Sequence, residues 1–120
     1  MSIPNAALQK LLQEVEVQAI QSQQKIGQTQ AEIGAKKREA RLNQLTSSEL
    51  DSLPKDNPVY EGVGKMFVAV PIDALNKRLT TESTTLKKDI TDLEKRLHYQ
   101  EMTFKNSRQH IEKILQSGSR

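Results

Sequence analysis

The sequence predicts a mainly α-helical protein in which a long antiparallel two-helix coiled coil carries a single β-hairpin at its turn end. Three observations lead to this fold class. Two polar stretches of similar length repeat apolar residues at alternating spacings of four and three, the 3.5-residue period of a coiled coil. The short segment between them is rich in β-branched and aromatic residues. Hydrophobic residues make up only 35% of the chain, against about 45–50% in globular proteins, which favours a narrow apolar seam over a compact core.

The first helical arm is expected over residues 5–45 of a single domain that spans residues 1–120. Thr46 and Glu49 have the spacing of a capping box, which predicts a break in the arm and then a short helical turn. This turn and a polar connector fill residues 46–58. Seven of the ten seam positions in the first arm are apolar; the ten are Leu8, Leu12, Val15, Ala19, Ser22, Ile26, Thr29, Ile33, Lys36 and Ala40.

The predicted hairpin covers residues 59–70 and is bounded by Pro58 and Pro71. Two short apolar runs flank Gly64 and Lys65, so the turn is expected at these two residues. Glycine suits such a turn because it takes positive φ without steric cost.

The second arm is expected over residues 71–116, with Pro71 at the first helical position and Asp73 in the first turn. The hairpin reverses the chain, so the two apolar seams are expected to pack against each other in antiparallel fashion. Nine of the thirteen seam positions in this arm are apolar; the thirteen are Ile72, Asn76, Leu79, Ser83, Leu86, Ile90, Leu93, Leu97, Gln100, Phe104, Ser107, Ile111 and Ile114.

The hairpin carries more apolar surface than two strands can bury. A lone two-stranded hairpin is at best marginal in water, and its unpaired edges invite further strands. We therefore predict a subunit-assembly role for this element; the alternative is that it packs only on its own helices. The predicted assembly residues are Val59, Tyr60, Val63, Met66, Phe67, Val68 and Val70.

Apolar residues are also concentrated where the first arm begins and the second arm ends. Leu11 and Leu115 lie beside the seam positions, so the stripe is wider than one helix partner requires. Extra apolar surface of this kind is suited to an exposed hydrophobic segment of another protein. Periodicity alone leaves open whether these residues bind such clients or only lock the end of the coiled coil. The predicted client-binding residues are Leu8, Leu11, Leu12, Val15, Ile111, Ile114 and Leu115.

Catalytic, metal-binding and cofactor-binding residues are not expected. His98 and His110 are twelve residues apart and cysteine is absent, which does not fit a metal site. The glycines and lysine of residues 62–65 lack the spacing of a phosphate-binding loop and the Ser or Thr that follows its lysine. No apolar run is long enough to span a membrane, so an intracellular protein is expected.

The charges are mixed in sign. A net charge of +3 on 18 basic and 15 acidic residues suits solvated helix faces better than a nucleic-acid surface. Lys36, Lys37, Arg38 and Arg41 nevertheless form a basic cluster. It is interpreted as a solvated face; the alternative is a contact with nucleic acid or with an acidic partner.

Several segments resemble a known family. Residues 59–67, Val-Tyr-Glu-Gly-Val-Gly-Lys-Met-Phe, are similar to the hairpin of β-class prefoldin subunits, within them the eukaryotic subunit 1 group. Gln23-Gln24-Lys25 and Leu45-Thr46 also resemble this family, and the helix–hairpin–helix layout spans nearly the whole chain. One hairpin rather than two is typical of the β class.

This resemblance implies a heterohexamer of two α-type and four β-type subunits, whose hairpins form a β-barrel that carries six coiled coils. It implies an ATP-independent, cytoplasmic co-chaperone that binds unfolded proteins such as actin and tubulin and transfers them to the cytosolic chaperonin. No nucleic-acid or membrane partner is implied. The competing hypothesis is a structural coiled-coil adaptor without holdase activity, which would have no use for an exposed Tyr60, Met66 and Phe67.

Overall fold

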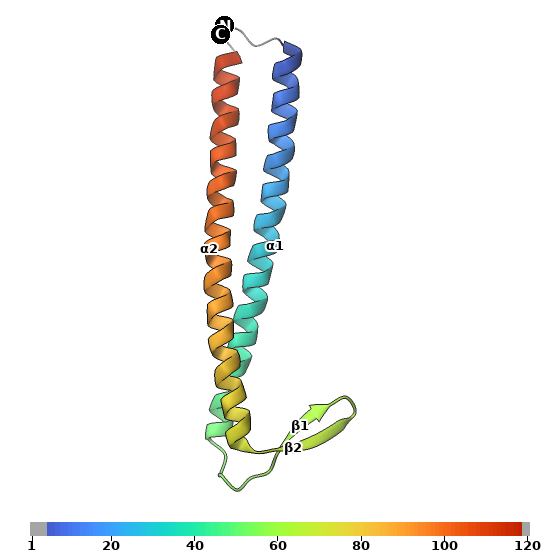
Figure 1. The fold of residues 1–120 in the computed structure, drawn as a ribbon, viewed down its shortest axis with the longest axis vertical. Helices are drawn as coiled ribbons and strands as arrows, with labels where there is room; N and C mark the ends of the chain where they lie inside the picture. The colour runs from blue at the N-terminus through green and yellow to red at the C-terminus, as the bar shows by residue number, and fades with distance from the viewer. Residues whose placement is uncertain (1–4, 119–120) are drawn as a thin grey trace. The chain divides into compact units, whose positions relative to one another are not determined.

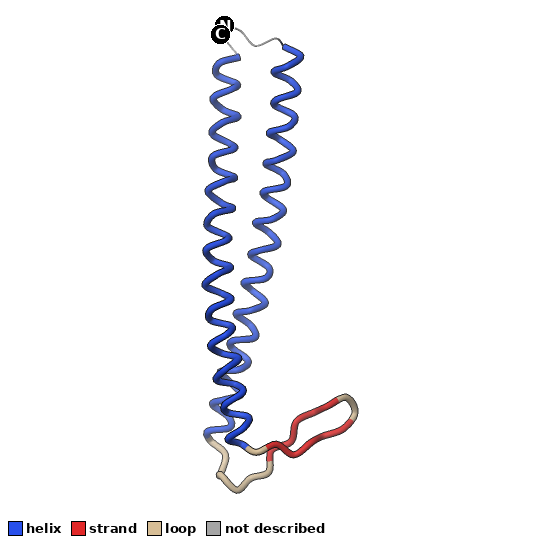
Figure 2. Tube along the Cα trace, viewed as in Figure 1, coloured by secondary structure: helices blue, strands red, loops and turns tan. Residues whose placement is uncertain are grey.

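The computed structural model describes residues 5–118 and contains four elements (Figures 1 and 2). Helix α1 covers Asn5–Asp51, strands β1 and β2 cover Val59–Val63 and Met66–Val70, and helix α2 covers Ile72–Gly118. Each helix is 47 residues long. The predicted fold class, two long helices joined by one antiparallel hairpin, is confirmed.

Helix α1 runs without interruption through the predicted break, so that prediction is wrong. The hydroxyl group of Thr46 caps no new helix; it donates to the carbonyl oxygen of Leu42, one turn earlier, at 2.8 Å. The helix ends only after Asp51. There the amide of Ser52 donates to the carbonyl oxygen of Glu49 at 3.2 Å, in the tighter spacing that often closes a helix.

The connector is consequently shorter than predicted, residues 52–58 instead of 46–58. Pro54 follows the helix, and its carbonyl oxygen accepts a hydrogen bond from the amide of Asn57 at 3.0 Å. Helix α2 begins at Ile72, one residue later than predicted. Pro71 precedes the helix, and its carbonyl oxygen accepts the first helical hydrogen bond, from the amide of Leu75 at 3.1 Å.

The chain divides into two compact units, Gly34–Asp92 and a second unit made of Met1–Ile33 with Leu93–Arg120. In Gly34–Asp92 the end of α1, the hairpin and the start of α2 meet. Leu50 of α1 is buried against Leu75 and Leu79 of α2, and Val59 and Val70 at the foot of the hairpin pack on this cluster. The hairpin is thus fixed to the helices at its foot, while the rest of it projects away from them (Figure 2).

In the other unit the first part of α1 and the last part of α2 run antiparallel (Figure 1). Val15, Ile33, Leu93 and Ile114 are its buried apolar residues. A polar residue is buried among them: Thr29 is only 4% exposed, and its Oγ1 donates a hydrogen bond of 2.8 Å to Oε1 of Gln100 on α2.

The alternating four-and-three spacing identified the packed face of each helix correctly. All ten seam positions predicted for the first arm and all thirteen predicted for the second are buried or half-buried. The prediction missed Leu75, which is buried at the start of α2. Leu75 stands three residues after Ile72 and four before Leu79, so it continues the same apolar stripe.

Replacement of Thr29 by Val is expected to lower the free energy of unfolding by about 1 kcal/mol, because it removes the donor to a part-buried Gln100. The double change Thr29→Val with Gln100→Leu should restore or exceed the native stability, since an apolar pair suits a coiled-coil seam. Urea unfolding of the full-length chain, followed by circular dichroism, measures both. A double variant less stable than Thr29→Val alone would contradict this account.

Candidate functional site

The hairpin has the turn that the sequence predicts. Strands β1 and β2 pair with Val59 opposite Val70 and Val63 opposite Met66, which leaves Gly64 and Lys65 as the two turn residues. Gly64 has a φ of 60°, whereas Lys65 has a negative φ. Positive φ at the first turn residue alone is typical of a type II′ hairpin turn, which favours glycine there.

The register sorts the side chains onto two faces, because residues directly opposite each other point to the same side. We call the side that meets the helices at its foot the helix face and the other side the outer face. The helix face consists of Val59, Glu61, Val63, Met66, Val68 and Val70, and the outer face of Tyr60, Gly62, Phe67 and Ala69.

An ion pair supports the helix face above its foot. Arg78 of α2 meets Glu61 of β1 through two contacts, Nη1 to Oε2 at 3.0 Å and Nη2 to Oε1 at 2.9 Å. The hydrogen bond with Glu61, and then the charge of that carboxylate, raise the pKa of Arg78 above its ordinary value. A bidentate guanidinium–carboxylate pair constrains direction as well as distance. It therefore adds a directional contact between β1 and α2 to the packing of Val59 and Val70 at the foot.

The outer face presents aromatic side chains to solvent. Phe67 is 77% exposed, and Tyr60 is exposed beside it. The Phe67 ring lies over Gly62, since a β-carbon placed on Gly62 would be 3.8 Å from Cε1 of Phe67. This is an ordinary van der Waals distance, so a small side chain at this position would not displace the ring.

The seven predicted assembly residues divide into two groups. Val59 and Val70 are engaged by the chain's own core. The other five are exposed: Tyr60, Val63, Met66, Phe67 and Val68. In the part of the chain that the structure describes, each strand has only one neighbour, so the outer edges of β1 and β2 are both unpaired.

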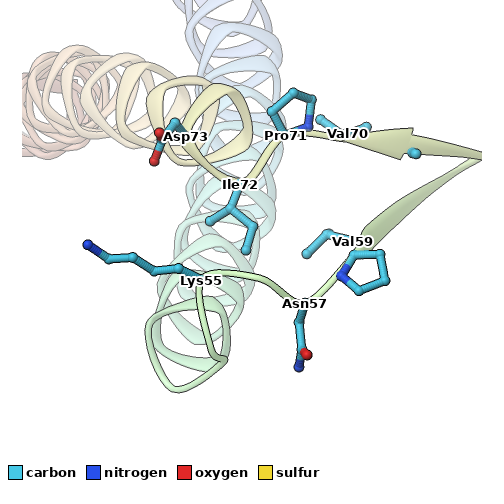
Figure 3. A pocket seen from close by; sticks show the side chains of 9 residues that line it. Lys55, Asn57, Val59, Val70, Pro71, Ile72 and Asp73 are labelled. Atoms are coloured by element: carbon cyan, nitrogen blue, oxygen red, sulfur yellow. The ribbon is translucent and has the colours of Figure 1, made fainter.

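A groove lies beside the foot of the hairpin, with a cavity volume of about 590 Å³. The connector contributes Lys55 and Asn57, and the beginning of α2 contributes Ile72 and Asp73 (Figure 3). Val59 and Val70 form its hairpin side (Figure 3). The unpaired strands are therefore flanked by a recess that their own chain does not fill.

The predicted client-binding residues differ in accessibility. Val15 and Ile114 are buried in the seam. Leu115 is 51% exposed. The remaining four, Leu8, Leu11, Leu12 and Ile111, are half-buried.

Two apolar residues near this group were not among the predicted residues. Val17 and Ile20 of α1 are both exposed, outside the seam. The signal that identifies them is the one applied to Leu11: an apolar residue that stands off the alternating four-and-three positions.

His98 and His110, considered and rejected as metal ligands, are both exposed on α2. Residues 5–118 contain no group of three or more His, Cys, Asp or Glu side chains placed to hold a metal ion. None of the helices described is both long enough and apolar enough to cross a membrane.

The fold and the site define a class of protein: two long helices joined by a hairpin that has unpaired strand edges and exposed apolar side chains. Comparison with known proteins gives the family. The family model described as "Prefoldin subunit" matches residues 13–118. The chain belongs to the prefoldin subunit family.

Individual relatives agree with this assignment. The chain is 33% identical to "Probable prefoldin subunit 1" of Schizosaccharomyces pombe, over 93% of this chain and 100% of the relative. It is 28% identical to "Prefoldin subunit 1" of Homo sapiens, over 90% of this chain and 88% of the human protein. The crystal structure of the prefoldin beta subunit from Thermococcus strain KS-1 has the same fold, with a TM-score of 0.58, 24% identity and coverage of 95% of this chain and 96% of that one. Membership of this family implies a co-chaperone role as one subunit of a prefoldin complex.

Replacement of Gly64 by Val is expected to destabilise the hairpin, because a β-branched residue at a φ of 60° costs about 1–2 kcal/mol. Gly62→Ala is the matched control, since its β-carbon would meet Phe67 only at ordinary van der Waals distance. Cross-strand nuclear Overhauser effects between Val63 and Met66 should weaken in the first variant and persist in the second. Equal signals in both variants would contradict the proposed role of the turn.

Proposed function

We propose that this chain is a β-class subunit of a heterohexameric prefoldin, in which it assembles with two α-type and three further β-type subunits. In this complex the hairpin residues join a shared β-barrel. The complex binds unfolded proteins such as actin and tubulin without ATP in the cytoplasm and transfers them to the cytosolic chaperonin.

The observation that carries this proposal is the exposed hairpin. It has two unpaired edges and exposes apolar side chains on both faces, although its foot is fixed to the helices. Isolated proteins seldom leave such strands open, because open edges promote aggregation. Strands from neighbouring subunits would satisfy the backbone groups and cover the aromatic rings together. A coiled-coil adaptor would have no use for this surface.

Client binding is proposed for the apolar residues of the unit in which α1 begins and α2 ends. Leu8, Leu11, Leu12, Val15, Ile111, Ile114 and Leu115 form this group, to which we now add Val17 and Ile20. Exposed Leu115, Val17 and Ile20 are available without unpacking the seam. Buried Val15 and Ile114 would contribute only where the helices separate. Several such weak surfaces in one complex would bind an unfolded chain by avidity, with no shaped pocket.

Phe67→Asp is expected to reduce incorporation into the hexamer at least tenfold, since burial of a phenylalanine contributes about 1.5–3 kcal/mol and the new carboxylate would be desolvated. Native mass spectrometry of complexes reconstituted with candidate partner subunits measures incorporation, and circular dichroism should show unchanged helicity. Tyr99→Asp is the matched control, because Tyr99 on α2 is 73% exposed and Phe67 is 77% exposed. Normal incorporation of Phe67→Asp would remove the assembly role of the hairpin.

The double change Leu11→Ser with Leu115→Ser is expected to lower suppression of client aggregation several-fold while hexamer assembly is retained. Light scattering of chemically unfolded actin, diluted in the presence of the reconstituted complex, measures suppression. Leu53→Ser serves as the control, because Leu53 is an exposed leucine in the connector. If the double variant suppresses aggregation as well as the native chain, these residues only stabilise the coiled coil.

A further inference from the structure

A second groove runs between the helices of the unit Gly34–Asp92, away from the hairpin foot. Its cavity volume is about 560 Å³, and we call it the basic groove. Half-buried side chains line it from both helices, Ala40 and Ser47 from α1 and Ser83 and Ile90 from α2. These four residues give it a partly apolar, partly hydroxyl-bearing floor.

The rim of the basic groove is cationic. Lys37 and Arg41 of α1 and Lys87 of α2 line it, all three exposed, together with exposed Gln44. None of its lining residues is a carboxylate. Within residues 5–118 none of these three cations takes part in an ion pair. Three positive charges from two helices thus face one recess without compensation.

Another groove, between the same stretches of the two helices, has the opposite character. Nζ of Lys36 is paired with Oδ2 of Asp89 at 3.7 Å, and Nδ2 of Asn43 donates to Oε2 of Glu82 at 3.4 Å. Glu39 lines it too. Residues 36–47 and 81–90 contain only three carboxylates, Glu39, Glu82 and Asp89, and all three belong to this groove. The helix pair therefore segregates its charges, with the acidic side chains in one groove and unpaired cations at the other.

We propose that the basic groove binds an acidic peptide segment of a partner protein. Carboxylates of the segment pair with Lys37, Arg41 and Lys87, with Arg41 able to hold a carboxylate through two hydrogen bonds. Methylene groups of the segment rest on Ala40 and Ile90. This site is separate from the hairpin and from the proposed client-binding residues, so it adds a docking surface to the complex.

The chemistry of the groove favours a peptide over nucleic acid. Single-stranded nucleic acids bind along extended cationic paths with aromatic side chains on which the bases stack. The basic groove has three cations and no aromatic side chain. Its serines and Gln44 offer hydrogen-bonding groups that suit a peptide backbone.

The test measures fluorescence anisotropy of a labelled peptide of alternating glutamate and alanine with the full-length chain, alone and in its assembled complex. The triple variant Lys37→Gln, Arg41→Gln, Lys87→Gln is compared with the control Lys10→Gln, Lys105→Gln, Lys113→Gln. The control residues are exposed and belong to the other unit. Each triple change removes three positive charges, so the net charge falls from +3 to 0 in both variants.

The groove variant is expected to weaken peptide binding about tenfold, because it removes three exposed charge pairs. The control variant should weaken peptide binding far less. Gln44→Glu, which places a carboxylate on the rim, should also weaken peptide binding. A peptide with glutamine in place of glutamate should not bind. Added salt should weaken binding of the acidic peptide, because it screens the charges.

Equal weakening by the two triple variants would overturn the proposal, since it would show a general charge effect. Tighter binding of a single-stranded oligonucleotide, lost in the groove variant, would also overturn it in favour of a nucleic-acid site. Native mass spectrometry of the same variants measures hexamer assembly, so that a loss of peptide binding can be told apart from a loss of assembly. The groove variants should enter the hexamer normally, and peptide binding by the free chain does not depend on the hexamer.

Discussion

A two-stranded sheet has two faces and two edges, and the helices of this chain cover only the foot of one face. Val59 and Val70 pack on Leu50, Leu75 and Leu79, and beyond them the apolar side chains of the hairpin meet solvent. Such a sheet is marginal by itself, because too little apolar area is removed from water. Folding of the chain and its proposed assembly are consequently linked, because the strands that the core anchors also expose the apolar area that neighbouring subunits would cover.

The seam between the helices combines apolar with polar residues. Polar side chains occupy several of its positions, and some of them are paired across the helices, Thr29 with Gln100 and Lys36 with Asp89. Polar groups at seam positions lower stability relative to leucine but penalise every register in which they lose their partners. A seam of this composition holds two helices in one alignment without making them inseparable. That property suits proposed client contacts that include residues of the seam itself.

Three surfaces with different chemistry can be distinguished on the chain. The hairpin offers backbone edges and aromatic rings, the residues around Leu11 and Leu115 offer aliphatic side chains, and the basic groove offers unpaired cations. They share no residue, so substitutions can separate assembly, client binding and docking of an acidic segment. The ion pair of Arg78 with Glu61 belongs to none of them; it connects β1 of the hairpin to α2.

The two helices and their seam were predictable from apolar spacing, and the hairpin with its turn from strand-forming residues around a glycine, because these signals are local properties of a sequence. The predicted helix break at Thr46 was wrong, because the Thr46 hydroxyl group donates to a carbonyl oxygen of the same helix. Whether the chain stays helical at this point depends on how the residues beyond it pack, which the local sequence does not show. Which hairpin residues face the core and which face solvent, the pairing of Arg78 with Glu61, and the segregation of charge between two grooves were decided only by the tertiary structure. Each depends on the rotation of one element against another, and a linear pattern does not encode that rotation.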